Sequence, residues 1–158
     1  DSKRFLSTLN QVIYENLQRM RTDKNLSLSL LDYHSGKLKL SGQHEELILV
    51  RANGEIQRID TIDLGFPIGL EADISAFVDQ HELFLEPGDG VVLYTDGITE
   101  AENEAKEQFG LDRLCEAIGC HWHQSASQIR QSIIKEVRQF IGSQTLYDDL
   151  TLLVLKRR

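Results

Sequence analysis

Residues 87–101 decide the fold, and they read Pro87-Gly88-Asp89-Gly90-Val91-Val92-Leu93-Tyr94-Thr95-Asp96-Gly97-Ile98-Thr99-Glu100-Ala101. The stretch opens with proline and glycine, which favour a turn. It continues with four β-rich residues, Val91–Tyr94, which predict a central strand. Thr95-Asp96-Gly97-Ile98-Thr99-Glu100, a segment with two acidic residues, follows that strand. The pattern therefore predicts a buried strand with acidic side chains just beyond its end.

A second acidic cluster, Tyr147–Thr151, stands directly before the closing strand predicted over Leu150–Leu155. Its adjacent carboxylates, Asp148 and Asp149, repel each other unless a cation neutralises them. Rigidly held oxygen ligands suit Mg²⁺ or Mn²⁺, and Gly97 would let a cation or its waters approach the backbone. Both clusters also have a simpler interpretation as solvated turns. The spacing of the residues does not show that the two clusters meet.

Apolar spacing predicts three helices. The first runs from about Lys3 to Arg21, with an inward stripe of Phe5, Leu9, Val12, Ile13, Leu17 and Met20. The second carries Leu111, Leu114, Cys115 and Ile118 and is expected to close at Gly119. The third starts with a capping box formed by Ser125 and Gln128 and ends at Gly142. Its inward residues are Ile129, Ile133, Val137, Phe140 and Ile141.

Extended segments occupy much of the first half of the chain. They are Leu26–Leu30, Leu38–Leu40, Leu47–Val50, Ile56–Ile59, Phe77–Val78 and Leu83–Leu85. Turn residues at 34–37 and the Asn53-Gly54 pair indicate hairpins. The order of a helix, several hairpin strands, two helices and a last strand favours an α+β fold over alternating βαβ units.

Composition limits the class of protein. The chain has 158 residues, 41% of them hydrophobic, and 17 Lys and Arg against 25 Asp and Glu give a net charge of −8. This profile predicts one globular domain with no nucleic-acid partner, since nucleic-acid binding depends on neutralising phosphates. No apolar run approaches the roughly 18 residues of a membrane span, and no signal segment opens the chain. We expect a cytoplasmic protein without a membrane partner, in which both cysteines are reduced.

These segments resemble the SpoIIE-like branch of the PPM-type metal-dependent protein serine/threonine phosphatases. The resemblance rests on residues 87–101, on Gln108-Phe109-Gly110-Leu111, and on residues 147–155. Ser41-Gly42-Gln43-His44 and Leu64–Leu70 are also similar to that branch, so the resemblance covers nearly the whole chain. It implies a layered α-β-β-α sandwich and a centre of two Mn²⁺ or Mg²⁺ ions. A metal-bridging water would attack phosphorus directly, without a phospho-enzyme.

The resemblance also implies roles for single residues. Asp96 matches the ligand of the family's Thr/Ser-Asp-Gly motif, and Asp148 matches the ligand that opens its Asp-Asn/Asp-x-Thr motif. Asp149 takes the second place of that motif and is expected to support the ligands rather than bind metal. Gly97, Thr95 and Thr151 flank the ligand positions and are expected to act in the same supporting way. No catalytic residue is predicted beyond the metal ligands.

The family's first metal motif, an Asp shortly before Gly-His-Gly, has no counterpart in the sequence. We therefore expect the chain to hold the later part of the phosphatase domain, N-terminally incomplete, with weak metal binding and little or no activity on its own. The resemblance implies a phosphorylated bacterial regulatory protein, similar to an anti-sigma-factor antagonist, as the substrate. A sensor domain fused upstream of the phosphatase domain is a further possibility that the resemblance implies. The alternative is a non-catalytic pseudophosphatase that recognises the same partners.

Two further groups of residues have competing interpretations. Cys115, Cys120, His121 and His123 offer zinc-ligand types, but their spacing does not fit common zinc sites and Cys115 falls on an apolar helix stripe. His44 could contact substrate or transfer a proton, or it could have a structural role in a loop. The Gly65–Gly69 loop lacks a phosphate-binding pattern, which argues against nucleotide binding.

Overall fold

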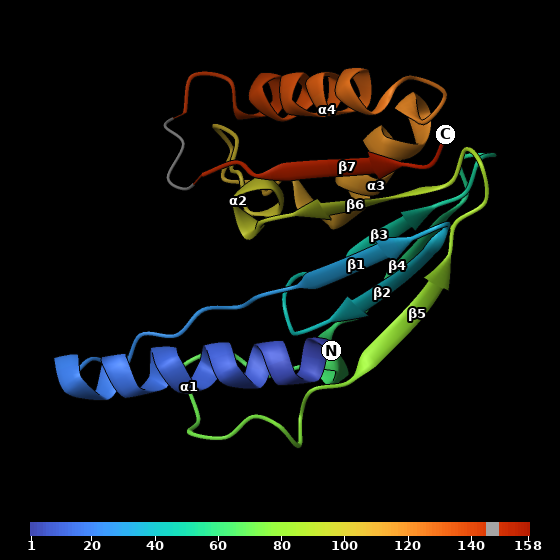
Figure 1. Cartoon of the computed structure of the whole chain (residues 1–158). Helices are drawn as coiled ribbons and strands as arrows, with labels where there is room; N and C mark the ends of the chain where they lie inside the picture. Colours follow the sequence, from blue (N-terminus) through green and yellow to red (C-terminus); the bar gives the residue numbers. More distant parts are fainter. Residues whose placement is uncertain (145–148) are drawn as a thin grey trace. The chain divides into compact units, whose positions relative to one another are not determined.

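The structure is a computed structural model that describes residues 1–144 and 149–158. The chain forms two compact units (Figure 1). The first unit comprises residues 1–44 and 60–84, and the second comprises residues 45–59 and 85–158. Each unit contains an antiparallel sheet and at least one helix, so the predicted α+β class is confirmed. No helix in the described ranges is long and apolar enough to cross a membrane.

The first unit combines helix α1 (Ser2–Met20) with a three-stranded sheet. Strands β1 (Leu30–His34), β2 (Lys37–Ser41) and β5 (Gln80–Phe84) lie in the order β1-β2-β5. Ser35 and Gly36 join β1 to β2 with positive φ angles of 50° and 89°, as a tight hairpin turn requires. The strand expected over Leu26–Leu30 is wrong, because Leu26 forms only an isolated bridge with Ile68 and β1 begins at Leu30.

Helix α1 buries a face that differs from the predicted one. Phe5, Val12 and Met20, assigned to the inward stripe, are 53%, 54% and 66% exposed. Leu17 of that stripe is buried, and Leu9 and Ile13 are partly buried against the core, but the buried face also contains Leu6 and Asn10, which the stripe did not include. Hydrogen bonds of Asn10 explain why this face is buried. Asn10 Nδ2 donates to the carbonyls of residues 71 and 72 at 2.9 and 3.3 Å, and Asn10 Oδ1 accepts from the amide of residue 69 at 2.8 Å. These bonds turn the Asn10 face of the helix inward.

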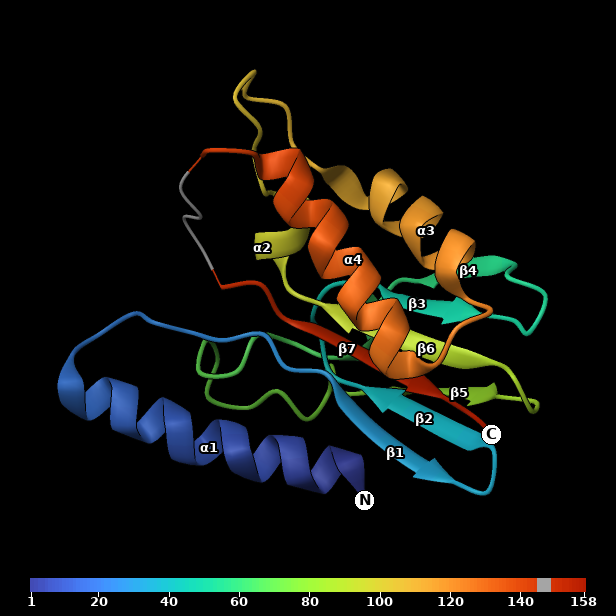
Figure 2. The ribbon, with the colours of Figure 1, turned by 90° about the horizontal axis from the view of Figure 1, so that it is seen from above.

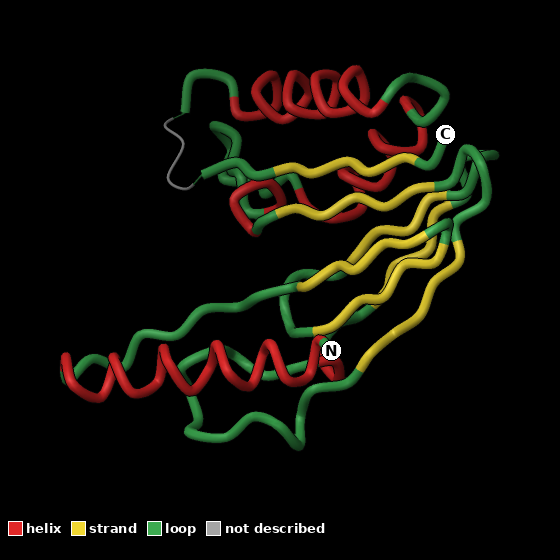
Figure 3. Tube along the Cα trace, in the orientation of Figure 1, coloured by secondary structure: helices red, strands yellow, loops and turns green. Residues whose placement is uncertain are grey.

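The segment between η1 (Ile62–Leu64), a short 3₁₀ helix, and β5 is a long loop without regular structure (Figure 3). Phe77 lies in a turn, with its amide donating to Ile74 O at 2.9 Å, so the extended segment predicted at Phe77–Val78 is wrong. Ile68, Ile74 and Val78 are nonetheless buried with Leu6 of α1 in one small core. The loop is therefore packed down on α1 by its own side chains.

The second unit contains a four-stranded antiparallel sheet with the order β4-β3-β6-β7. Its strands are β3 (Leu47–Val50), β4 (Ile56–Ile59), β6 (Gly90–Tyr94) and β7 (Leu152–Lys156). Strand β6 pairs with β3 on one side and β7 on the other, so the prediction of a central strand is confirmed. Helices α3 (Gly110–His121) and α4 (Ala126–Ile141) lie on one face of this sheet (Figure 2).

Two sequence predictions for these helices had different outcomes. The capping box of Ser125 and Gln128 is present at the start of α4, and Gly142 ends the helix with a φ of 65°. Helix α3, however, passes through Gly119 and continues to His121. The continuation brings Trp122 into the core, where the ring is 1% exposed and its Nε1 donates to Gly88 O at 3.1 Å. Burial of that large ring outweighs the roughly 1 kcal/mol cost of a glycine inside a helix.

A buried carboxylate fixes the turn that leads into β6. Asp89 is 3% exposed and accepts hydrogen bonds from the Ala52 and Glu86 amides at 2.8 and 3.0 Å. Arg51 Nη1 donates to the same carboxylate at 2.8 Å. Burial by itself raises the pKa of Asp89, but the hydrogen bonds and the charge of Arg51 outweigh it and lower that pKa. The start of the central strand is thereby anchored to the segment that follows β3.

Candidate metal centre

Asp96 stands where the central strand of the second unit ends. Strand β6 stops at Tyr94, Thr95 follows in extended conformation, and Asp96 begins the one-turn helix α2 (Asp96–Thr99). Asp96 is exposed, while Gly97 and Ile98 behind it are buried. Asp96 Oδ1 accepts a hydrogen bond from Gly97 N at 2.9 Å. The carboxylate is therefore oriented by the backbone and faces solvent from a fixed position.

The second acidic cluster meets the first at this point. Thr95 N donates to Thr151 O at 3.2 Å, and Thr151 N donates to Thr95 Oγ1 at 3.2 Å. Thr95 Oγ1 donates in turn to Asp149 O at 3.2 Å. Strand pairing continues directly from these bonds, since Tyr94 lies opposite Leu152 in the β6–β7 ladder. The structure thus brings together two segments more than fifty residues apart, a proximity that their spacing in the sequence could not establish.

The candidate ligands are only partly within the described residues. Asp96 is described, whereas Asp148, the second expected ligand, lies outside the described residues. Asp149 is exposed, and its carbonyl is the atom that contacts Thr95. Within residues 1–144 and 149–158, no three His, Cys, Asp or Glu side chains are grouped closely enough to hold a metal ion. The described part of the centre contributes one carboxylate and the backbone that supports it.

The residues at this junction fit a divalent cation in ligand type. An exposed carboxylate on a rigid strand end is a hard oxygen donor of the kind that Mg²⁺ and Mn²⁺ prefer. Thr95 has a supporting position, because its hydroxyl joins the two segments and leaves Asp96 uncovered. The described residues supply only some of the several oxygen ligands that such ions need.

The side of the junction that faces the protein interior is apolar. Tyr94 is 2% exposed and packs in the core formed by the sheet, α3 and α4. Burial raises the pKa of the Tyr94 hydroxyl well above its ordinary value, and the nearby carboxylates of Glu45 and Glu46 raise it further. Tyr94 therefore stays neutral and acts as packing beneath the strand end, not as an acid or base near neutral pH.

Two other segments of the family resemblance pack against each other in the first unit. Gly42 N donates to Leu64 O at 2.8 Å. A Cβ atom on Gly65 would lie 2.6 Å from both Gln43 N and Gly42 Cα, so only glycine fits at this backbone crossing. His44 lies just beyond it, with Nδ1 2.7 Å from Ser27 Oγ and its amide donating to Thr61 Oγ1 at 2.9 Å. These contacts give His44 a structural role in the loop.

The four residues weighed as zinc ligands are distributed along α3 and just after it. Cys115 is half-buried, and burial raises the pKa of its thiol, which disfavours the thiolate that zinc requires. Cys120 is exposed. His121 Nε2 lies 2.6 Å from Glu136 Oε1 and its Nδ1 lies 3.3 Å from Gln124 Nε2, so both ring nitrogens already have partners. These contacts are typical of side chains on the surface of a helix, not of a zinc site.

Sequence reasoning missed two features of this region. The one-turn helix α2 lies where the sequence predicts a turn. The Thr95-Asp96 pair could have indicated the helix, since a threonine before an acidic residue is typical of a helix start. The anchoring carboxylate Asp89 was interpreted only as turn chemistry. Because Asp side chains are rarely buried without partners, the residue type alone did not indicate that Asp89 would be buried.

Comparison with known proteins identifies the fold and the family. The family model described as Stage II sporulation protein E (SpoIIE) matches residues 1–158. Phosphoserine phosphatase RsbU of Bacillus subtilis is 28% identical over 161 residues, which cover 97% of this chain and 44% of RsbU. Protein IcfG of Synechocystis sp. is 26% identical over 133 residues, which cover 84% of this chain and 20% of IcfG. The chain thus spans less than half the length of either relative.

Solved structures agree in fold. The SiaA-PP2C domain of Pseudomonas aeruginosa superposes with a TM-score of 0.77 at 22% identity, covering 94% of this chain and 58% of that one. The phosphatase domain of SpoIIE from Bacillus subtilis, presoaked with Mn, gives a TM-score of 0.62 at 17% identity, covering 99% and 67%. Since the family model matches every residue, the resemblance seen in the sequence is confirmed, and the chain belongs to the SpoIIE family.

Proposed function

We propose that this chain carries the function of a metal-dependent protein serine/threonine phosphatase. The observation that supports this most is the junction of the two acidic segments, where Thr95 bonds to Asp149 and Thr151 and leaves the Asp96 carboxylate exposed. Relatives named as a phosphoserine phosphatase and as phosphatase domains support the same activity.

In this proposal Asp96, together with Asp148, holds the divalent cations, Mn²⁺ or Mg²⁺. When bound, such cations neutralise phosphoryl oxygens and lower the pKa of water, which are the main requirements of phosphate monoester hydrolysis. The protein's own contribution is positional. Gly97 N–H orients the Asp96 carboxylate, and the Thr95 hydroxyl keeps the Asp149–Thr151 segment against the end of β6.

The proposed substrate is a phosphoserine or phosphothreonine of a bacterial regulatory protein, of the class that includes anti-sigma-factor antagonists. Two relatives support this choice of class: RsbU, and a Mycobacterium tuberculosis protein whose solved structure contains RsbU and RsbW domains. The latter superposes with a TM-score of 0.64 at 18% identity, over 92% of this chain and 40% of that one. A cytoplasmic location fits such a substrate and is part of the proposal.

A second candidate function is a non-catalytic module that recognises the same partners. The observation that favours it is the small number of donors, because the described residues provide no group of three metal-binding side chains. The two candidates differ in one measurable property, since only the phosphatase needs a divalent cation to act on a phosphoprotein.

The test uses the natural gene product that carries this chain and a synthetic phosphoserine peptide. Released phosphate is measured with Mn²⁺, with Mg²⁺ and with EDTA, for the wild type and for Asp96→Asn. The phosphatase proposal predicts cation-dependent release that the Asp96→Asn substitution lowers by at least about a hundredfold. Release that is absent in every condition, or unaffected by EDTA, would favour the second candidate or overturn the metal mechanism.

A further inference from the structure

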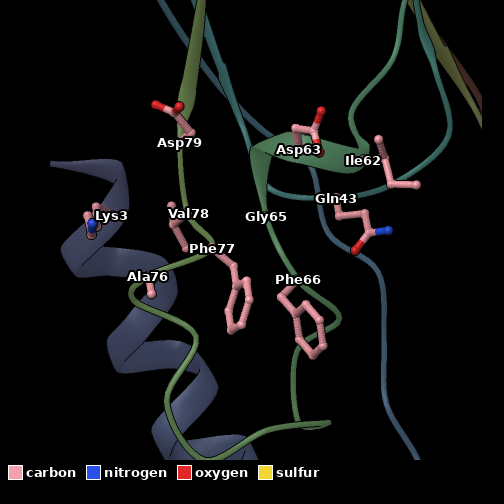
Figure 4. Close-up of a pocket in the computed structure, with 10 residues that line it drawn as sticks. All are labelled: Lys3, Gln43, Ile62, Asp63, Gly65, Phe66, Ala76, Phe77, Val78 and Asp79. Carbon is pink, nitrogen blue, oxygen red and sulfur yellow. The ribbon is translucent and has the colours of Figure 1, made fainter.

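The first unit contains an open pocket of about 640 Å³ that the proposed activity does not use. Its lining residues come from α1, the 42–44 loop, η1 and the loop that follows (Figure 4). They are Lys3, Gln43, Ile62, Asp63, Gly65, Phe66, Ala76, Phe77, Val78 and Asp79. The volume falls within the roughly 300–1,000 Å³ of pockets that bind ligands. All of these residues belong to one compact unit.

Apolar side chains form one part of this pocket and remain exposed. Phe66 and Phe77 stack with ring centroids 4.8 Å apart and an interplanar angle of 27°. Phe77 is 48% exposed and Ile62 is 60% exposed. Figure 4 shows the two rings side by side, with both Asp63 and Asp79 toward the other end of the view. An apolar group that enters the pocket would cover the rings and gain the free energy of leaving water.

Negative charge surrounds the apolar part. Residues 60–79 contain five acidic residues and no lysine or arginine. They are Asp60, Asp63, Glu71, Asp73 and Asp79, and all five are exposed. In the described part of the chain, neither Asp63 nor Asp79 has a salt bridge with a lysine or arginine. Two exposed carboxylates against one lysine in the lining favour a cationic ligand over an anionic lipid or a nucleic acid.

Lys3, the one basic residue of the lining, is placed close to Asp73. The pKa of Asp73 is lowered mainly by hydrogen bonds from Ser75, and the positive charge of Lys3 lowers it further. The Asp79 carboxylate accepts a local bond from Gln80 N, at 2.7 Å. Lys3 lines the pocket together with Asp63 and Asp79, and within the described residues it forms no salt bridge with either carboxylate.

The loop that carries the pocket is held in a fixed shape although it lacks regular structure. Asn10, completely buried, bonds to the backbone of residues 69, 71 and 72. Gly65 crosses the backbone of Gly42 and Gln43 so closely that no Cβ fits. A surface that is already rigid loses little conformational freedom on binding, which favours recognition.

We propose that this pocket binds a protein segment that presents an apolar side chain next to a lysine or arginine. The apolar side chain covers the Phe66–Phe77 pair, and the cation is attracted by the Asp63 and Asp79 carboxylates at the other end of the pocket. A protein segment is the occupant that suits an open pocket with apolar and acidic parts side by side, since affinity then comes from the buried aromatic contact and orientation from the charges. The inference does not depend on phosphatase activity.

The test is an NMR titration of the ¹⁵N-labelled natural gene product that carries this chain, with three amidated decapeptides of equal length. One peptide carries leucine and phenylalanine flanked by arginines, the second replaces the arginines with glutamates, and the third replaces the apolar pair with serines. We expect saturable shifts of the amides of residues 65, 66, 76 and 77 with the first peptide only. Affinity should fall several-fold between about 50 and 300 mM salt, because charges contribute.

Substitutions in the pocket test whether the peptide binds there. Phe77→Ala should weaken the first peptide at least about tenfold, as expected for an aromatic anchor. The double change Asp63→Asn and Asp79→Asn preserves shape, should weaken binding several-fold and should remove most of the salt dependence. Phe84→Ala is the matched control, because Phe84 is a 63% exposed ring on β5 beyond the pocket lining. Circular dichroism of each variant checks that it folds.

Several results would overturn the proposal. They are equal affinity for the arginine and glutamate peptides, shifts that map outside the pocket, no binding of any peptide, or equal effects of Phe77→Ala and Phe84→Ala. If sedimentation shows that the chain self-associates and that Phe77→Ala abolishes it, a second copy of the chain is the occupant and the proposal is wrong.

Discussion

Replacing Asp96 with asparagine should weaken metal binding strongly and leave the fold unchanged. Asp96 is exposed at the start of α2, and its Oδ1 accepts one hydrogen bond, from Gly97 N at 2.9 Å. Asparagine has an oxygen in the same place and can keep that bond. The substitution therefore removes one negative charge and little else, and the free energy of unfolding should change by no more than about 0.5 kcal/mol.

The expected loss of metal affinity is much larger than this. Substitution of residues that only support metal ligands costs about 10- to 100-fold in affinity. A direct carboxylate ligand should cost at least about a hundredfold, which corresponds to about 2.7 kcal/mol. At a Mn²⁺ concentration a hundred times the wild-type dissociation constant, binding stabilises the folded state by about 2.7 kcal/mol. For a domain of this size the Tm should rise by about 5–11 °C.

The assay combines calorimetric titration with thermal unfolding, both on the natural gene product that carries this chain. At the same Mn²⁺ concentration the Asp96→Asn variant should gain only about 1–2 °C in Tm. Asp112→Asn is the matched control, because the Asp112 side chain is 94% exposed on α3 and should leave metal affinity unchanged. Equal affinities of the wild type and Asp96→Asn would refute the assignment of Asp96 as a ligand.

Three further predictions concern hydrogen bonds and close backbone contacts that stabilise the two units. Thr95→Val removes the hydroxyl that accepts from Thr151 N, and it should lower the free energy of unfolding by about 0.5–1.5 kcal/mol in urea titrations. Thr95→Ser should lose much less, and equal losses would contradict the role of the hydroxyl. Asp89→Asn should cost at least about 1.5 kcal/mol at pH 7. Because folding lowers the pKa of Asp89 below its ordinary 3.8, the stabilisation is complete above that value and is lost as the pH falls through the folded-state pKa. Wild type and variant should therefore converge in acid, and a constant difference would count against a charge effect. Gly65→Ala should lower the Tm strongly, since its Cβ would lie 2.6 Å from backbone atoms. Gly119→Ala lies inside α3, where the nearest atom to an added Cβ is 3.6 Å away, and it should stabilise the fold by up to about 1 kcal/mol. Thermal unfolding of both variants measures the two effects, and the opposite order would contradict the packing described.

Local patterns were sufficient to predict several elements of the fold. The capping box at Ser125 and the glycine at 142 predicted both ends of α4, because each acts through bonds within a few residues. The β-rich run Val91–Tyr94 predicted a central strand, since a continuous apolar run needs burial on both faces.

The errors share a physical cause, which is a partner far away in the sequence. Helix α1 has apolar residues around more than one face, and the bonds of Asn10 to the distant 69–72 loop select the buried one. Helix α3 passes Gly119 because Trp122 is buried beyond it. Neither effect is visible from helix periodicity or from a glycine alone.

The candidate site was predicted in its residue types but not in its assembly. Strand-end carboxylates at Asp96 and Asp148–Asp149 indicated a cation, while the contact between their segments depends on the pairing of β6 with β7. That pairing is long-range, and the Thr95 bonds that complete it follow from the register Tyr94 opposite Leu152. The metal-ligand roles of Asp96 and Asp148 remain predictions.

Anomalous diffraction tests the central claim most directly. Crystals of the natural gene product grown with MnCl₂ would be measured on both sides of the manganese absorption edge. We predict an anomalous peak about 2.1 Å from a carboxylate oxygen of Asp96, beside the Thr95–Thr151 junction, and its loss in Asp96→Asn. A manganese peak that lies only elsewhere in the molecule, or no peak at a saturating concentration, would contradict it.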